Sequence, residues 1–132
     1  MKFPSQKYLK QRLMNNSMAV GSLGAQLDRR LNILSDYVIP KEKQDAFSNS
    51  YLDSILIESE ISRLFIVGLD AAFCVNGTIE GARNRGYDIA VISDAILSDP
   101  DSMKNFMLDE FVNRGVEILN SQKFFVELQN GK

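Results

Sequence analysis

Short, β-rich apolar runs alternate with helical segments from residue 36 to residue 128, and this alternation constrains the fold most strongly. The run over 64–69 (LFIVGL) is continuously apolar, as expected for a strand buried on both faces of a sheet. Further strands are predicted over 37–39, 88–92 and 116–119, and helices over 7–14, 51–60, 71–85, 100–114 and after Ser121. We therefore expect an α/β fold, a Rossmann-like parallel sheet in three layers with helices on both faces.

Length and charge set limits on domains and partners. The 132 residues fit one domain over 1–132, in which the segment 1–20 has no clear pattern. The net charge of -2 is spread over intermixed acidic and basic residues, so we expect no nucleic-acid partner. No apolar run approaches the roughly 20 residues that a membrane span needs, and the first residues lack the apolar centre of a signal peptide. A cytoplasmic protein without a membrane partner is expected.

The chain contains one cysteine and no histidine. The absence of histidine excludes the Ser-His-Asp and Cys-His modes of activation and the commonest zinc ligand. Catalytic chemistry would have to use Cys, Lys, Asp, Glu, Tyr and backbone amides, and the sequence suggests neither a metal nor a cofactor. A single cysteine cannot form an internal disulfide, so Cys74 is either a small buried hydrophobic residue or a reactive thiol.

The position of Cys74 is compatible with reactivity. It follows the predicted strand 64–69 by five residues and opens the next predicted helix. Sites in parallel sheets lie beyond the carboxyl ends of the strands, and the free amides and dipole of a helix start stabilise an anion such as a thiolate. Position alone leaves both interpretations of Cys74 open.

The segment from Phe65 to Ala95, FIVGLDAAFCVNGTIEGARNRGYDIAVISDA, resembles the nucleophile segment of the isochorismatase-like cysteine hydrolases, which include nicotinamidases and N-carbamoylsarcosine amidases. Upstream, YVIPKEKQDAFSNSYLDSIL resembles the family's second element, in which a lysine ends a strand ahead of an Ala-Phe pair and a helix. Together with GSLGAQLDRRL, the resemblance covers about residues 20 to 128. The matching positions in the nucleophile segment are Gly68, Cys74, Val75, Thr78, Ala82, Gly86, Tyr87, Asp94 and Ala95.

The resemblance implies roles for particular residues. Cys74 takes the position of the nucleophile and Lys41 that of the catalytic lysine, whereas Lys43 is only a neighbour. The amides of Phe73 and Cys74 would receive the oxyanion of the attacked carbonyl. A cis peptide bond is implied between Leu69 and Asp70. The implied substrate is a small amide, carbamoyl or vinyl-ether compound, and no substrate-binding residue is identified.

The family's third catalytic residue, an aspartate at the end of the first strand, has no match in this chain. We expect an isochorismatase-like fold that lacks its N-terminal third. Asp70 is the only carboxylate close to Cys74 in sequence, and bonding to the turn amides is expected of it rather than proton transfer. For Asp94 a structural hydrogen-bonding role is expected.

Two functions stay open. The first is an enzyme, a cysteine hydrolase whose turnover is impaired by the missing aspartate. The second is a non-catalytic truncated relative that serves as a binding or oligomerisation module. A sheet without its first strand exposes an unpaired edge and apolar surface, so a homo-oligomer is expected in both cases.

Overall fold

The structure is a computed structural model that describes residues 26–27 and 29–131. The chain divides into two compact units, Met1–Val38 and Ile39–Lys132. In the first unit the described residues contain neither helix nor strand, and the Tyr37 amide donates to Ser35 Oγ at 3.0 Å. The helix predicted over 7–14 lies outside the described residues. The strand predicted over 37–39 is wrong, because a β-rich run without a ladder partner forms no sheet, and Val38 is 62% exposed.

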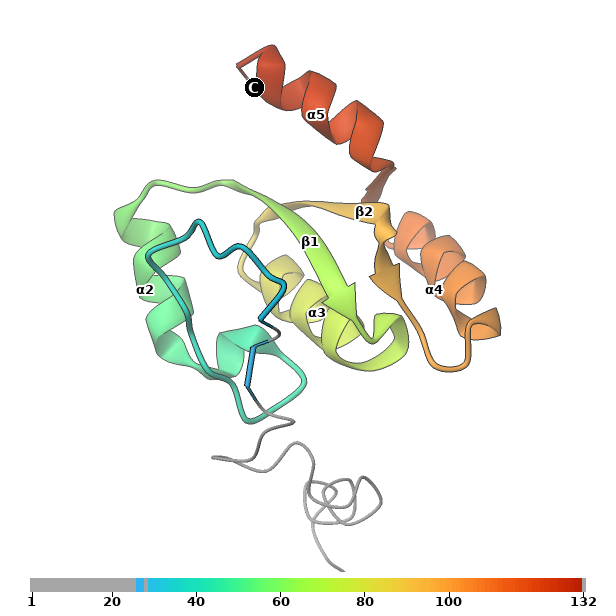
Figure 1. The fold of residues 1–132 in the computed structure, drawn as a ribbon, viewed down its shortest axis with the longest axis horizontal. Coiled ribbons are helices and arrows are strands. Elements are labelled where there is room, and N and C mark those ends of the chain that lie inside the picture. The colour runs from blue at the N-terminus through green and yellow to red at the C-terminus, as the bar shows by residue number, and fades with distance from the viewer. Residues whose placement is uncertain (1–25, 28, 132) are drawn as a thin grey trace, which may run out of the picture. The chain divides into compact units, whose positions relative to one another are not determined.

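A parallel sheet is the centre of the second unit (Figure 1). Its strands, in the order β1-β2-β3, are β1 (Arg63–Leu69), β2 (Asp88–Leu97) and β3 (Glu117–Leu119). Both strand pairs are parallel, so the predicted α/β fold is confirmed. The register of β1 on β2 shifts between Ile66 and Gly68, where Gly68 has φ +130°. Beyond this irregularity β2 continues to Leu97, five residues further than predicted.

The helices follow the predicted order, with differences at their starts. The elements are η2 (Ala46–Ser48), α2 (Ser50–Glu58), η3 (Ala71–Val75), α3 (Asn76–Asn84), α4 (Ser102–Asn113) and α5 (Ser121–Gln129). Asp101 precedes α4 in place of Asp99, and the Asp99–Pro100 peptide bond is cis. Asn120 rather than Ser121 caps α5, because its side chain accepts from the Lys123 amide at 2.8 Å.

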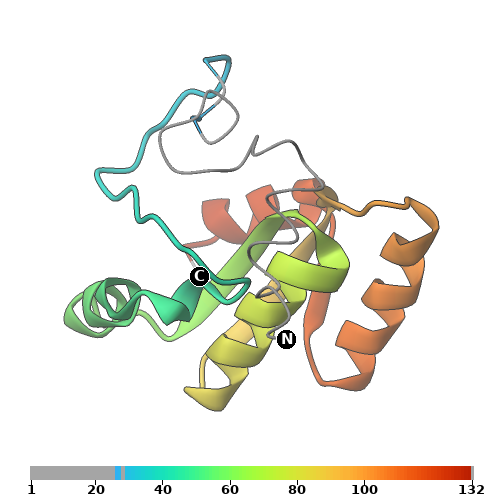
Figure 2. The ribbon, with the colours of Figure 1, turned by 90° about the horizontal axis from the view of Figure 1, so that it is seen from below.

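Alternate side chains of β2 enter two apolar clusters on opposite faces of the sheet. Ile89 and Val91 belong to the larger cluster, which contains residues of η3, α3 and α4. Ala90 and Ile92 belong to the smaller one, against which Phe124 of α5 packs. The helices therefore cover both faces: α5 lies opposite α3 and α4 in Figure 1, and Figure 2 shows α3 between α2 and α4. This arrangement places the start of α3 beside the carboxyl end of β1.

Asp94 links β2 to the start of α5 by hydrogen bonds, in line with the structural role expected of it. The end of the predicted strand was placed before Asp94, but the residue lies within β2. Its carboxylate accepts from the Ser121 hydroxyl at 2.6 Å and from the Ser121 amide at 2.8 Å. These bonds, the hydroxyl first, lower the pKa of Asp94 below its ordinary value of 3.8.

The contribution of Asp94 to stability should disappear in acid. A carboxyl whose pKa is lower in the folded state than in the unfolded chain stabilises the fold above the ordinary value of 3.8, and this contribution is lost as the pH falls through the lowered value. Urea denaturation at pH 7 and pH 3 should therefore show a smaller acid-induced loss of stability for Asp94→Asn than for the wild-type chain. Asp101→Asn, which removes an exposed carboxylate without a capping bond, is the control and should follow the wild type. Equal losses in all three proteins would contradict the assignment.

Candidate active site

Cys74 lies in the π-helical turn η3, which leads directly into α3. The turn closes on Asp70, whose carbonyl accepts from the amides of Phe73 at 3.1 Å and Val75 at 3.0 Å. Ala71 and Val75 are buried in the larger cluster, whereas Cys74 between them is only partly buried. The two buried neighbours fix the turn, and the thiol stays accessible from outside.

Lys41 is the residue that the structure brings to the thiol. Its Nζ lies 3.3 Å from Cys74 Sγ, although the two residues are 33 positions apart. The same ammonium donates to the carbonyl oxygen of Lys43 at 2.9 Å. Lys43 thus contributes a backbone acceptor that orients the amine of Lys41.

The loop that carries Lys41 is held at both ends by side chains. The Asn49 amide donates from Nδ2 to the Pro40 carbonyl at 2.9 Å, and Asn49 Oδ1 accepts from the Tyr51 amide at 3.1 Å. At the other end, the Ala46 amide donates to Thr78 Oγ1 at 3.0 Å. The sequence pattern assigns neither residue to the site. Thr78 is only a matching position of the family resemblance, and the one local signal at Asn49 is that an Asn directly before a predicted helix can cap it.

Asp70 has a structural role in the turn. Its Oδ1 accepts from the Ala72 amide at 3.0 Å and from the Ser98 hydroxyl at 2.8 Å, and its Oδ2 accepts from the Asp99 amide at 3.2 Å. The peptide bond between Leu69 and Asp70 is cis, as the family resemblance implied. Both carboxylate oxygens therefore join the end of β1 to the segment that follows β2.

The proposed oxyanion donors belong to this same turn. The Phe73 amide already donates to the Asp70 carbonyl, so an oxyanion bound there would share that N–H with the carbonyl. Around the turn, apolar side chains reach the surface. Leu69 and Leu97, which are paired in register at the ends of β1 and β2, are 61% and 60% exposed.

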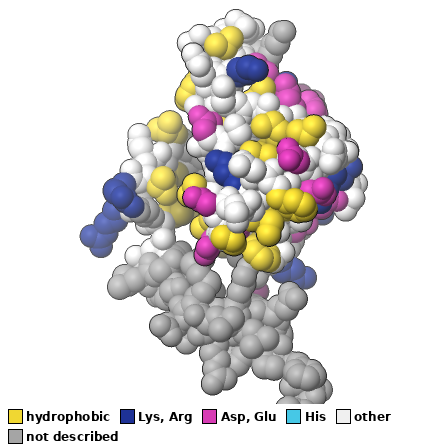
Figure 3. Space-filling view, turned by 90° about the vertical axis from the view of Figure 1, so that its right-hand side faces the viewer, with side chains coloured by type: hydrophobic (Ala, Val, Ile, Leu, Met, Phe, Trp, Pro, Cys, Tyr) yellow, Lys and Arg dark blue, Asp and Glu magenta, His cyan; other side chains and the backbone are white. Residues whose placement is uncertain are grey.

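Further apolar surface lies over α4. Figure 3 shows this side of the molecule, where hydrophobic side chains gather between charged ones. Phe106 and Val112 of α4 are 58% and 56% exposed. Exposed aromatic and aliphatic side chains on one helix are typical of surfaces that contact another molecule.

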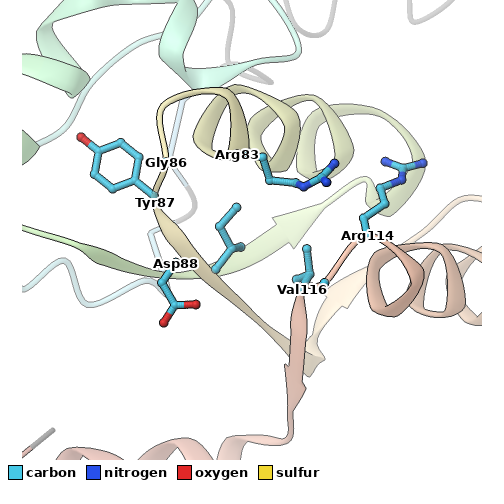
Figure 4. A pocket seen from close by; sticks show the side chains of 8 residues that line it. Arg83, Gly86, Tyr87, Asp88, Arg114 and Val116 are labelled. Atoms are coloured by element: carbon cyan, nitrogen blue, oxygen red, sulfur yellow. The ribbon is translucent and has the colours of Figure 1, made fainter.

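A shallow hollow lies at the opposite end of the sheet (Figure 4). Arg83 and Arg114 extend along one side of it, and both pair with Glu80, at 3.1 Å each. Arg114 also pairs with Glu110 at 3.6 Å, so two carboxylates offset the two guanidinium charges. The Tyr87 ring turns away because its hydroxyl donates to Asp53 at 2.9 Å, and desolvation followed by this bond raises the pKa of Tyr87. The lining residues are Arg83, Gly86, Tyr87, Asp88, Ile89, Arg114, Gly115 and Val116.

Among the described residues, no three His, Cys, Asp or Glu side chains come together as a metal site would require. None of the helices described is both long and apolar enough to cross a bilayer.

Comparison with known proteins finds similar sequences and similar folds. A family model described as the isochorismatase domain matches residues 2–123. The isochorismatase family protein YaaI of Bacillus subtilis (strain 168) is 32% identical over 79 residues, which are 60% of this chain and 44% of that protein.

Solved structures of hydrolases and amidases also resemble this chain. A cysteine hydrolase from Pseudomonas syringae pv. phaseolicola has a TM-score of 0.80 at 19% identity, over 94% of this chain and 65% of that one, and supports the fold alone. The N-carbamoylsarcosine amidase from Thermoplasma acidophilum has a TM-score of 0.69 at 29% identity, over 85% and 64%. A nicotinamidase from Staphylococcus aureus has a TM-score of 0.57 at 34% identity, over 59% and 49%. The chain thus spans between 44% and 65% of the length of these relatives.

Proposed function

This chain belongs to the isochorismatase family, and from that membership we propose that it is a cysteine hydrolase with Cys74 as its nucleophile. One observation carries the proposal: Lys41 Nζ lies 3.3 Å from Cys74 Sγ. A thiolate needs a partner of opposite charge at a neutral pH, and in a chain without histidine a lysine is a suitable one. Lys41 is therefore proposed as the cation that keeps Cys74 ready for attack.

The proposed reaction has two stages. The Cys74 thiolate attacks the carbonyl carbon of an amide, a sulfur–carbon bond forms, and the electron pair of the carbonyl moves to its oxygen. The amides of Phe73 and Cys74 are the proposed donors to this oxyanion. When the carbonyl reforms, the leaving nitrogen takes a proton from solvent, the carbon–nitrogen bond breaks, the amine departs and a thioester remains on Cys74. Water then cleaves the thioester, which gives the carboxylic acid and the Cys74 thiol, and the thiol returns its proton to solvent to restore the thiolate.

A small amide is the proposed substrate, and carbamoyl and vinyl-ether compounds are the other classes considered. Two similar proteins are named as a nicotinamidase and an N-carbamoylsarcosine amidase, and both names describe amide cleavage. The exposed Leu69 and Leu97 beside the turn favour a substrate without a large charge. The unpaired cysteine fits a reducing compartment, and we propose that the protein works in the cytoplasm.

Lys41→Ala should slow the alkylation of Cys74. Because the chain has a single cysteine, iodoacetamide reports on this thiol alone. Loss of the ammonium removes the charge that favours the thiolate, and we expect the rate at neutral pH to fall about three- to tenfold. Lys43→Ala is the matched control, since the Lys43 contact to Lys41 uses the backbone carbonyl and survives the substitution. Equal rates in all three proteins would remove Lys41 from the site.

Turnover should be much weaker than thiol reactivity. Proton transfer to the leaving amine needs a further group and contributes roughly a hundred- to ten-thousand-fold in rate. Both oxygens of Asp70 are engaged in the turn, which argues against this role for it. We expect very slow release of ammonia from nicotinamide by a chain whose Cys74 alkylates readily. Brisk turnover by the wild-type chain would contradict this expectation, and it would be assigned to Asp70 only if Asp70→Asn abolished turnover while Cys74 still alkylated at the wild-type rate.

We also propose that the chain forms a homo-oligomer. Within the described residues β1 is an edge strand, since it pairs with β2 alone, and Val67 near its end is 55% exposed. Exposed strand edges and apolar patches favour association. Light scattering at micromolar concentration should give a mass that is a multiple of 14.9 kDa. The mass of a single chain, unchanged as the concentration rises, would rule out this assembly.

A further inference from the structure

We propose that Thr78 is a positioning residue that fixes the amine of Lys41 against the thiol of Cys74. The proposal rests on the proposed function, in which Lys41 stabilises the Cys74 thiolate. Thr78 touches neither the thiol nor the amine in the contacts described above. It acts through the loop between Lys41 and Ala46, which it binds at two backbone atoms.

The first observation is the double hydrogen bond of the Thr78 hydroxyl. Oγ1 accepts from the Ala46 amide at 3.0 Å and donates to the Gln44 carbonyl at 3.4 Å. Thr78 follows Cys74 by four residues, one helical turn further along the chain. The segment that contains Cys74 therefore also contains Thr78, whose hydroxyl binds the loop of Lys41.

The second observation is the close approach of the loop to α3. A Cβ atom at Gly77 would lie 3.1 Å from the Asp45 amide nitrogen and from Gln44 Cβ. A Cβ atom at Gly81 would lie 2.4 Å from Asp45 Oδ1. Two glycines on either side of Thr78 thus leave room for the loop to lie against the helix, where the hydroxyl can reach its backbone.

A short series of contacts joins the hydroxyl to the thiol. Thr78 holds the carbonyl of Gln44, and the neighbouring carbonyl of Lys43 accepts from Lys41 Nζ at 2.9 Å. That nitrogen in turn lies 3.3 Å from Cys74 Sγ. If the loop moves away from α3, the Lys43 carbonyl moves with it, and the amine loses the acceptor that orients it toward sulfur. The hydroxyl therefore influences the thiolate through the position of Lys41.

Substitution of Thr78 tests this inference through the alkylation rate. Thr78→Val keeps the shape of the side chain and removes the hydroxyl, so the iodoacetamide rate at neutral pH should fall about threefold. Thr78→Ser restores the hydroxyl and should return the rate to that of the wild type. Ser121→Ala is the control, because it removes a hydroxyl of α5 that donates to Asp94 of β2 and has no bond to the Lys41 loop. Its rate should be unchanged.

The decisive comparison uses the Lys41→Ala background. If Thr78 acts through Lys41, Thr78→Val should slow alkylation in the wild-type chain and have no effect in the Lys41→Ala chain. An equal slowing in both backgrounds would overturn the proposal, because it would mean a general effect on the fold. A wild-type rate for Thr78→Val, with a slowed Lys41→Ala chain, would overturn this inference and leave the proposed function intact. A wild-type rate for Lys41→Ala would instead overturn the proposed function itself.

Discussion

The carboxylate of Asp70 is the interaction on which the rest of the site depends. It accepts from the Ala72 amide inside the cysteine turn, from the Ser98 hydroxyl and from the Asp99 amide. One side chain therefore connects the end of β1, the turn and the segment after β2. Buried or partly buried donors need such acceptors, and one acceptor group that serves three donors links their positions. The orientation of Cys74 follows from this network and from the burial of its two neighbours in the core.

The second requirement is that a distant loop reaches the same turn. Lys41 comes from a segment without regular structure, and its amine is oriented by the Lys43 carbonyl while the loop is fixed by Asn49 and Thr78. A lysine side chain has many rotamers, and holding one of them costs conformational entropy. Backbone and side-chain contacts within the loop offset part of that cost. The helix α3 therefore helps to position Lys41, through Thr78, as well as Cys74, which lies in the turn directly before it.

The parts of the fold that the sequence predicted are those with strong local signals. The continuous apolar run before Cys74 and the run starting at Asp88 became parallel strands, and Cys74 follows the first of them as expected. The strand predicted over 37–39 failed because β propensity supplies no ladder partner. The extension of β2 to Leu97 depends on the irregularity at Gly68, a tertiary feature without a local pattern. For the same reason the contacts of Thr78 with the Lys41 loop could not be read from spacing, since they join residues more than 30 positions apart.

The pairing of a thiol with an amine defines what this scaffold can do without other groups. In the proposed mechanism Lys41 pairs with the Cys74 thiolate, so attack on a carbonyl needs no base at that moment. Expulsion of an amine is different, because nitrogen must gain a proton before it leaves, and neither a lysine that pairs with sulfur nor an aspartate bonded to three donors is well placed to give one. In the proposed mechanism, formation of the first covalent bond and completion of the cycle therefore depend on different groups. Cys74 and Lys41 serve the first step, and a further group must supply the proton of the leaving amine.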